Sequence, residues 1–498
     1  MITRILACFL LISFCRDPAG AQSKRFDFNT RCRQAYQDIM MMKLNSGTRL
    51  LQQEEQADPS NLAPYFLDNY ADFFRLFFSA DPREYNRLKA KRDQRLAMMD
   101  QGDPGSPYYL YTKAIIHFQW AILKIVFEEY WSAAWEFRRS YLLIKDNYRR
   151  FPAFGPNKIL LGAMQAVMGT VPDGYKWAAN ILGMSGSISK GMSLLKSYVN
   201  DTGTEGELFK EEAYFYYASL KFYIENKPEE ALQFIRSRNM DLKNNPLYAL
   251  VVVNLSINHY MGGYGLKVID GLNNGPEYLD MPVMNFEAGM LKLDHLEIAE
   301  AIHYLGEYVN NFKGKFYVKN ALQGLSWAYY LEGDMTRAEK YRQLILTRGN
   351  AEADADKSAL REAKAGGWPN KELLRARLLS DGGYFEEALK ILGARKAEDF
   401  PDLAEKIEYA YRIARVYDQL GKEEQAIPLY EVTIKTGYNR PEYFAARAAL
   451  QLGYIYEKRG EKAKAISSYR QCLAMNEKEY KNSLDQKAKA GIDRLTGN

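Results

Sequence analysis

The chain has 498 residues, of which 47% are hydrophobic and 26% are charged. This balance is typical of a folded globular protein and excludes a disordered, a collagen-like and a multi-span membrane protein. The 67 lysines and arginines outnumber the 62 aspartates and glutamates only slightly, for a net charge of +5. So small a net charge on so long a chain gives no electrostatic footprint for nucleic acid, and we expect no nucleic-acid partner.

The first residues have the features of an export signal. Arg4 is followed by an apolar run that ends at Cys15, and Ala19-Gly20-Ala21 is a small-residue cleavage site. The apolar run is shorter than the roughly 20 residues that span a membrane. We therefore predict that residues 1–21 are a signal peptide that is cleaved after Ala21.

Two cysteines in this segment allow a lipoprotein alternative. It is disfavoured, because bulky Phe14 stands where a lipobox needs a small residue, and few apolar residues precede Cys8. We expect an exported protein, periplasmic or associated with the cell envelope, without a transmembrane helix in the mature chain. Cleavage would leave Cys32 and Cys472 at opposite ends, so apolar burial rather than disulfides has to stabilise the fold.

Residues 22–204 are predicted to form a divergent N-terminal helical region. No alternating strand pattern occurs there, and stop and start signals such as those in Gly102–Pro107 separate the apolar periodicities. The glycine-rich stretch Val171–Gly191 predicts an irregular insertion. The helical patterns cover Leu62–Phe78, Pro82–Met99, Tyr108–Phe127 and Trp131–Arg150.

One of these helices holds the most basic stretch of the chain, Arg83–Arg95. It could be a solvated helix face or a stripe that binds nucleic acid. Glu84 and Asp93 dilute the charge, and Tyr85 is the single aromatic residue within it. These features favour a solvated face.

The C-terminal part repeats itself. In one unit Leu452-Gly453 is followed by Tyr456, Gly460, Ala465 and Tyr469. The glycine ends a first helix in a left-handed turn, and the small residues let a second helix approach closely. The preceding unit matches this pattern, and eroded or weaker copies lie further upstream. The preceding unit has Ile413-Ala414, Tyr417, Gly421, Ala426 and Tyr430. The eroded copies are marked by Gly383, Gly333 and Asn226. The weaker copies run over residues 281–312 and 247–272.

This pattern resembles the tetratricopeptide repeat, clearly over residues 315–498 and in degenerate form over 205–314. The resemblance implies an all-α fold, a right-handed α-solenoid of stacked antiparallel helix pairs with a concave face made by the first helices. In such arrays positions 2, 5, 9 and 12 of each first helix commonly face that concave surface.

Carried over by register, these positions predict a groove for a protein or peptide partner. The mixture of aromatic rings, guanidinium groups and amides suits an extended chain or an amphipathic helix, although the rings could also serve only to pack neighbouring helices. Capture of chaperone tails is disfavoured, because the carboxylate-clamp variant of the family needs asparagine at position 9. The predicted groove residues are Asn320, Gln323, Trp327, Tyr330, Arg377, Tyr411, Arg415 and Tyr454, with Asn370, Leu373, Ser380, Glu408, Asp418, Arg447, Leu450 and Glu457 at the other positions of the same registers.

The sequence shows little that indicates catalysis. It has no Gly-x-Ser-x-Gly elbow and no zincin motif. His295 and His303 lie eight residues apart rather than the four that are usual for metal ligands on one helix. We predict no catalytic residue, no metal and no cofactor.

The sequence therefore predicts an exported, non-catalytic scaffold or adaptor for protein–protein interactions. The alternative is a surface component that binds glycans or nutrients, because SusD-like proteins combine similar helical repeats with aromatic platforms. A third hypothesis is an enzyme with its site near Tyr108–Tyr198, which no motif supports. The identity of the partner and the oligomeric state stay open.

Overall fold

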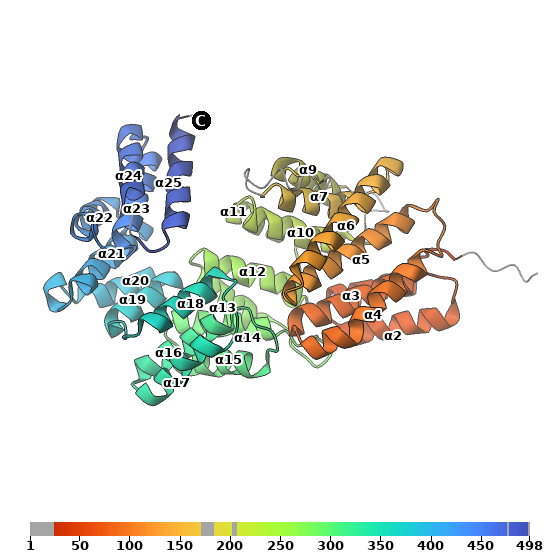
Figure 1. The fold of residues 1–498 in the computed structure, drawn as a ribbon, viewed down its shortest axis with the longest axis horizontal. Helices are drawn as coiled ribbons and strands as arrows, with labels where there is room; N and C mark the ends of the chain where they lie inside the picture. Colours follow the sequence, from red (N-terminus) through yellow and green to blue (C-terminus); the bar gives the residue numbers. More distant parts are fainter. Residues whose placement is uncertain (1–23, 171–183, 202–206, 476–477, 497–498) are drawn as a thin grey trace, which may run out of the picture. The chain divides into compact units, whose positions relative to one another are not determined.

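The computed structural model describes residues 24–170, 184–201, 207–475 and 478–496 (Figure 1). Within these ranges the regular elements are helices, joined by turns and loops, with two isolated β-bridges at Lys24 and Arg25, which confirms the predicted all-α class. The described helices include none that is both long and apolar enough to cross a membrane. The predicted signal peptide and residues 171–183 of the predicted insertion lie outside the described residues.

The chain divides into two compact units. The first unit comprises residues up to 75 together with 83–213, and the second comprises 76–82 together with the residues from 214 onward. The predicted boundary between residues 204 and 205 lies near this division and stays a prediction.

The four helices predicted in the N-terminal region are confirmed to within about two residues at each end. The start of α5 (Pro107–Val126) follows from local capping. The Ser106 hydroxyl accepts a hydrogen bond from the amide of Tyr108, and Pro107 takes the first helical position. The helices are α1 (Thr30–Met40), α2 (Leu44–Ala57), α3 (Ala63–Ser79), α4 (Pro82–Met99), α5 (Pro107–Val126), α6 (Tyr130–Arg150), α7 (Asn157–Met168), α9 (Ile188–Val199) and α10 (Lys210–Tyr223).

The second unit includes α10 from Tyr214 onward and, after it, helices that pack mainly against their neighbours in the chain. They are α11 (Pro228–Ser237), α12 (Pro246–Asn258), α13 (Gly262–Gly271), α14 (Pro282–Asp294), α15 (Ile298–Asn311), α16 (Val318–Glu332), α17 (Met335–Thr347), α18 (Asp354–Ala365), α19 (Lys371–Asp381), α20 (Phe385–Gly393), α21 (Leu403–Gln419), α22 (Glu423–Gly437), α23 (Phe444–Lys458), α24 (Lys462–Ala474) and α25 (Lys481–Thr496). The α-solenoid of antiparallel helix pairs that the sequence predicts is thus confirmed.

The turn inside each helix pair contains one residue with a positive φ. Glycine fills this position where the repeat is clearest, because a residue without Cβ adopts the left-handed conformation without strain. Tyr260 and Leu296 fill it in the two weakest repeats, and for that reason the sequence does not reveal these turns. Along the second unit the positions are Asn226 (φ 53°), Tyr260 (57°), Leu296 (61°), Gly333 (92°), Gly383 (86°), Gly421 (72°) and Gly460 (75°).

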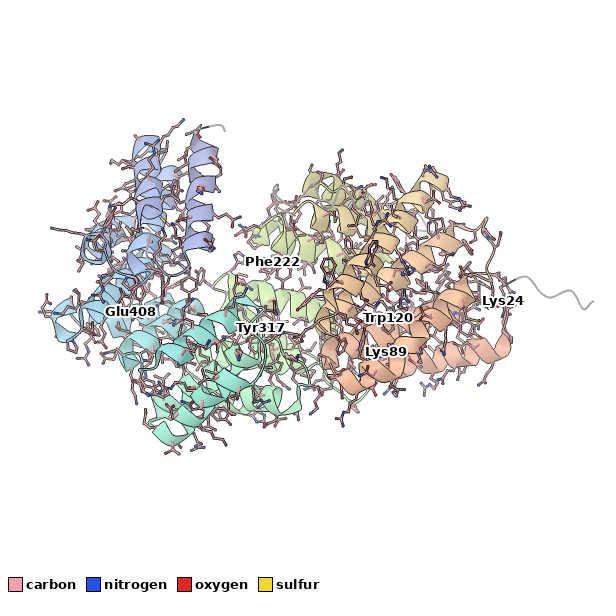
Figure 2. The ribbon with its side chains drawn as sticks, viewed as in Figure 1. Lys24, Lys89, Trp120, Phe222, Tyr317 and Glu408 are labelled. Carbon is pink, nitrogen blue, oxygen red and sulfur yellow. The ribbon has the colours of Figure 1, made fainter. Side chains whose placement is uncertain are left out.

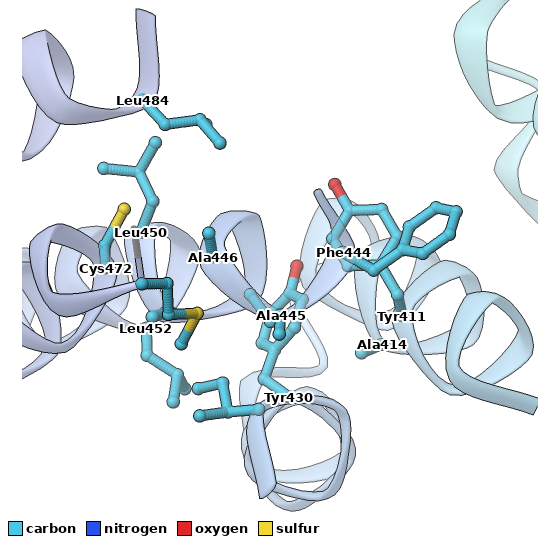
Figure 3. Close-up of a cluster of buried hydrophobic side chains, with 14 of the residues drawn as sticks. Tyr411, Ala414, Tyr430, Phe444, Ala445, Ala446, Leu450, Leu452, Cys472 and Leu484 are labelled. Atoms are coloured by element: carbon cyan, nitrogen blue, oxygen red, sulfur yellow. The ribbon is translucent and has the colours of Figure 1, made fainter. Parts of the chain in front are cut away.

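The core of the last repeats is apolar and closely packed (Figure 3). Tyr430 and Tyr469 are fully buried at the aromatic position that the pattern predicts, and Cys472 packs beside them as a free thiol. Leu450 lies in the same cluster, so this predicted groove position offers no surface to a partner.

The first unit buries charged groups as well as apolar ones. Arg95, in the stretch expected to be solvated, is only 5% exposed and forms ion pairs with Asp68 and Asp72 of α3. Its neighbour Asn69 accepts a hydrogen bond from the indole of Trp120, which is labelled in Figure 2. The expectation of a solvated face is therefore wrong for this end of α4, because the ion pairs compensate the charge that burial would otherwise disfavour.

Glu136 is the centre of a second buried network in the first unit. Its carboxylate lies 2.6 Å from Nδ1 of His117, 2.9 Å from Lys124 and 2.7 Å from Arg92. Burial by itself would raise the pKa of Glu136, but the hydrogen bonds from His117 and Lys124 and the charge of Arg92 outweigh it and lower the pKa to about 2.

Candidate functional site

Two adjoining pockets lie in the second unit, and both contain predicted groove residues. The first, which we name the aromatic pocket, has a volume of about 290 Å³ and lies between α16, α17, α18 and the connection to α19. Arg377 lines both pockets and so joins them. The aromatic pocket is lined among others by Gln323, Trp327, Arg342, Glu362, Trp368 and Arg377.

The walls of the aromatic pocket are fixed by stacking and hydrogen bonds. Tyr330 stacks on Trp368 with 4.7 Å between ring centroids, and its hydroxyl donates to the carbonyl of Pro369 at 2.8 Å. The Arg377 guanidinium lies 4.8 Å from the ring centroid of Trp327. Gln323 donates to Glu362 at 2.7 Å. The pocket is therefore pre-formed, with one carboxylate among aromatic faces.

The second pocket, which we name the arginine pocket, has a volume of about 190 Å³. Among the residues that the structure describes, four arginines and four tyrosines line it, from α19, α21, α23 and the turns that precede α13, α23 and α25. They are Arg377, Arg412, Arg415 and Arg447 with Tyr260, Tyr411, Tyr443 and Tyr480.

Two of these arginines are neutralised by carboxylates of their own helix. Arg412 forms an ion pair with Glu408, which Figure 2 labels on α21. Arg415 lies 3.0 Å from Asp418, and it also donates to the Tyr260 hydroxyl at 3.3 Å.

Arg377 is paired more loosely. Its nearest carboxylate oxygens, on Glu362 and Asp381, lie 3.7 and 3.8 Å away, which is within the range of an ion pair but beyond that of a hydrogen bond.

Arg447 differs from the other three arginines. Its guanidinium has no hydrogen bond and no ion pair with any described residue, and it lies 6.0 Å from the ring centroid of Tyr443. The hydroxyls of Tyr411 and Tyr443 likewise have no hydrogen-bond partner within the described ranges. The arginine pocket thus holds one uncompensated positive charge and unused hydrogen-bond donors.

Contacts between distant parts of the second unit build this pocket. The amide of Gly262 donates to the carbonyl of Gly382 at 3.0 Å, which brings the turn of α12 and α13 against the turn of α19 and α20. A Cβ on Gly383 would lie 1.9 Å from the carbonyl oxygen of Tyr260, so this close approach requires glycine there. Tyr480 reaches α18, where its hydroxyl lies 2.8 Å from Oγ of Ser358.

The structure brings some of the predicted groove residues together and separates others. Gln323, Trp327, Arg377, Tyr411 and Arg415 line the two pockets, as do Ser380 and Arg447. Their role in binding a partner stays a prediction.

The remaining predicted positions lie elsewhere. Asn320 and Tyr454 line neither of these pockets, Asn370 caps α19, and Leu373 is fully buried in the core beside Leu379. Leu373 and Leu450 are buried because each packs into a cluster of apolar side chains from neighbouring helices.

Sequence reasoning missed the pocket residues that come from turns. Trp368, Tyr443 and Tyr480 lie between helices, so the helical register did not include them. Tyr260 was missed because its repeat is degenerate. An aromatic residue directly before a helix start is the signal that two of them share, since Tyr443 and Tyr480 precede α23 and α25.

The described part of the chain contains no group of three histidine, cysteine or acidic side chains that could hold a metal ion. His295 instead contacts Glu297 at 2.6 Å and stacks on Tyr384. Burial raises the pKa of the Cys32 thiol to about 12 and that of the Cys472 thiol to about 11, so both thiols are protonated at neutral pH. Cys32 is fully buried.

Comparison with known structures finds helical-repeat proteins. The chain is similar to the TPR domain of P58(IPK), at 14% identity over 83% of this chain and 95% of that one, with a TM-score of 0.22. It is similar to yeast Tom70 at 12% identity over 94% of this chain and 96% of that one, with a TM-score of 0.26. It is also similar to the APC/C hetero-tetramer Cut9-Hcn1 at 11% identity over 95% of this chain and 99% of that one, with a TM-score of 0.23. No protein of curated function matches the sequence.

A family model for the tetratricopeptide repeat matches residues 407–431 and 446–479. These ranges contain most of α21 and α23, which supply Tyr411, Arg412, Arg415 and Arg447 to the arginine pocket. The match, the antiparallel helix pairs and the glycine turns agree with one another. The chain therefore contains tetratricopeptide repeats, which the family model matches within residues 407–479.

Proposed function

We propose that this protein is an exported, non-catalytic scaffold that binds a segment of a partner protein in the cell envelope through the two pockets of its second unit. The observation that carries the proposal is the adjacency of the aromatic and arginine pockets, which share Arg377. Apolar contact area and fixed hydrogen-bond donors side by side suit an extended segment with an apolar anchor next to a polar one.

The pre-formed walls support this proposal. Stacked rings and ion pairs hold the pocket side chains in place before a partner arrives, so little side-chain entropy would be lost on binding. The two pockets together enclose about 480 Å³, which suits a few side chains of a peptide rather than a large folded surface.

The glycan-binding alternative receives less support from the same geometry. A sugar platform needs an aromatic face that is open to solvent. Trp327 is only 8% exposed and is covered by Arg377, and Trp368 contacts both Tyr330 and Arg342. An affinity gel with a panel of polysaccharides tests this alternative, because a mobility shift would favour it over a peptide site.

Export is the second part of the proposal, and it rests on residues 1–21 of the sequence. Mass spectrometry of the protein purified from its own host tests it. A mature chain that begins at Gln22 supports a protein without a lipid anchor, and an acylated cysteine would place it on a membrane surface. A chain that retains Met1 would contradict export.

Photo-crosslinking tests the site. We would replace Tyr480, which lines the arginine pocket and is 38% exposed, by p-benzoylphenylalanine. The matched control is the same replacement at Tyr438, which is 40% exposed and lies at the end of α22 outside both pockets. A partner that crosslinks in the host at position 480 but not at 438 supports the proposal. Equal crosslinking, or none, contradicts it.

A further inference from the structure

The arginine pocket has a charge pattern that indicates what it binds. Three of its arginines have carboxylates within 4 Å, whereas the guanidinium of Arg447 has none among the described residues. Since an uncompensated charge in a partly buried site is unfavourable, the pocket is electrostatically incomplete without an anion.

The surroundings of Arg447 strengthen the positive field. The charge of Arg447 acts on Lys487 of α25, which also has no ion-pair partner in the described part of the chain. Partial burial, and then the charge of Arg447, lower the pKa of the Lys487 ammonium, as expected where two cations face each other.

Neutral hydrogen-bond donors complete the pocket. The hydroxyls of Tyr411 and Tyr443 are free to donate, and the side chain of Tyr411 is 5% exposed, so it is held firmly in place. A volume of about 190 Å³ equals that of roughly six water molecules in the liquid, which is enough for one short acidic side chain.

We propose that the arginine pocket binds the carboxylate of an aspartate or glutamate side chain within an extended segment of the partner, with Arg447 as its counter-ion and Tyr411 and Tyr443 as hydrogen-bond donors. This inference rests on the proposed function, because it assigns the chemistry of one of the two pockets. Arg447 lines the pocket without an ion-pair partner and matches one monoanionic carboxylate. Lys487 is not among the lining residues, so a phosphate dianion would lack a second open cation inside the pocket.

The adjacent aromatic pocket gives the segment a second contact. An apolar side chain on the same segment would occupy the aromatic pocket, which Trp327 and Trp368 line, and Arg377 lines both pockets. The site therefore selects an acidic residue near an apolar one in an extended chain.

Fluorescence anisotropy with labelled peptides and the full-length mature protein tests this inference. The probe is a short peptide of alternating glutamate and leucine, blocked at both ends so that its terminal carboxylate is absent. The comparison peptides carry glutamine or phosphoserine in place of glutamate. We expect the glutamate peptide to bind at least about tenfold more tightly than either, with an affinity that falls as salt rises.

Variants locate the binding. Arg447→Ala is expected to weaken binding of the glutamate peptide by at least about tenfold, and Arg447→Lys, which keeps the charge but loses the guanidinium fork, by less. The control Lys458→Ala removes the same charge from the same helix, outside the pocket, and is expected to leave binding unchanged.

Several results would overturn the inference. Equal binding of the glutamine peptide, tighter binding of the phosphoserine peptide, or unchanged binding by Arg447→Ala would each do so. If no peptide binds while position 480 still crosslinks a partner in the host, the carboxylate assignment is wrong and the proposed function stands. If both experiments fail, both proposals are wrong.

Discussion

Two charged sites of the first unit differ from one arginine of the second unit in whether the charge is compensated. In the first unit Arg95 and Glu136 are each about 5% exposed, and each is surrounded by groups of opposite charge. In the second unit Arg447 lines a pocket without any such partner among the described residues. Compensated charges stabilise a fold, whereas an uncompensated charge at a pocket is available to a ligand. The comparison thus separates charged residues that build the protein from those that we propose to bind its partner.

Arg95 gives the largest expected effect. Arg95→Ala would remove the buried cation that Asp68 and Asp72 of α3 share and leave only the half-exposed Lys91 beside them. Breaking a buried ion pair in this way typically lowers the free energy of unfolding by about 3–5 kcal/mol. Urea unfolding followed by circular dichroism measures this loss. A loss below about 1 kcal/mol would show that the network is not structural and would remove the contrast between the units.

Gly383 tests whether the arginine pocket depends on the close contact of two turns. Gly383→Ala places a methyl group against the carbonyl of Tyr260 at a positive φ of 86°, and we expect a loss of about 3–4 kcal/mol in the free energy of unfolding.

The control is Gly306→Ala in the middle of α15, where a Cβ would meet nothing within 4 Å. It is expected to be neutral or stabilising by up to about 1 kcal/mol, because alanine favours the helix. Similar behaviour of the two variants would contradict the tight approach of the turns.

Glu287 of the second unit and Glu136 of the first unit are expected to change the stability with pH in opposite directions. Burial raises the pKa of Glu287 in α14 to about 7, partly offset by a hydrogen bond from Asn254. The folded protein therefore binds a proton at Glu287 that the unfolded chain has released, and stability falls by about 3 kcal/mol as pH rises from about 4.5 to 7. Glu287→Gln is expected to remove this fall.

Glu136 has the opposite sign. Because the pKa of Glu136 is lowered to about 2, its contribution is complete above about pH 4.5 and is lost as the pH falls toward 2. Thermal melts between pH 3 and 8 of Glu287→Gln, Glu136→Gln and the unchanged protein measure both the fall in stability toward neutral pH and the fall toward acid pH. A profile that Glu287→Gln leaves unchanged between pH 5 and 7 would show that this carboxyl group is ionised in the folded protein.

Arg447 gives the smallest expected effect on stability. Because its guanidinium forms no ion pair with the described residues, Arg447→Ala is expected to change the free energy of unfolding by less than about 0.5 kcal/mol. Paired with Arg95→Ala in the same urea titration, it compares an open arginine with a compensated one. A large loss of stability would mean that Arg447 supports the fold and would weaken its assignment to a partner.

Local patterns predicted the helices and most of their turns. The limits of α4 and α6, the glycines at 333, 383, 421 and 460, and the buried Tyr430 and Tyr469 follow from periodicity and turn chemistry within a few residues. Such signals depend on contacts between residues three or four apart, which the sequence displays directly.

The pockets depended on contacts that no local pattern displays. Tyr260 meets Arg415 across more than 150 residues, Tyr480 meets Ser358 across more than 120, and the direction of Leu450 or Arg95 depends on which helix lies beside it. The sequence by itself therefore determined the all-helical repeat and the register of its helices. Only the tertiary structure decided which of those side chains are buried, which are paired and which meet in the pockets, because the packing between repeats sets distances that local hydrogen bonding and periodicity do not specify.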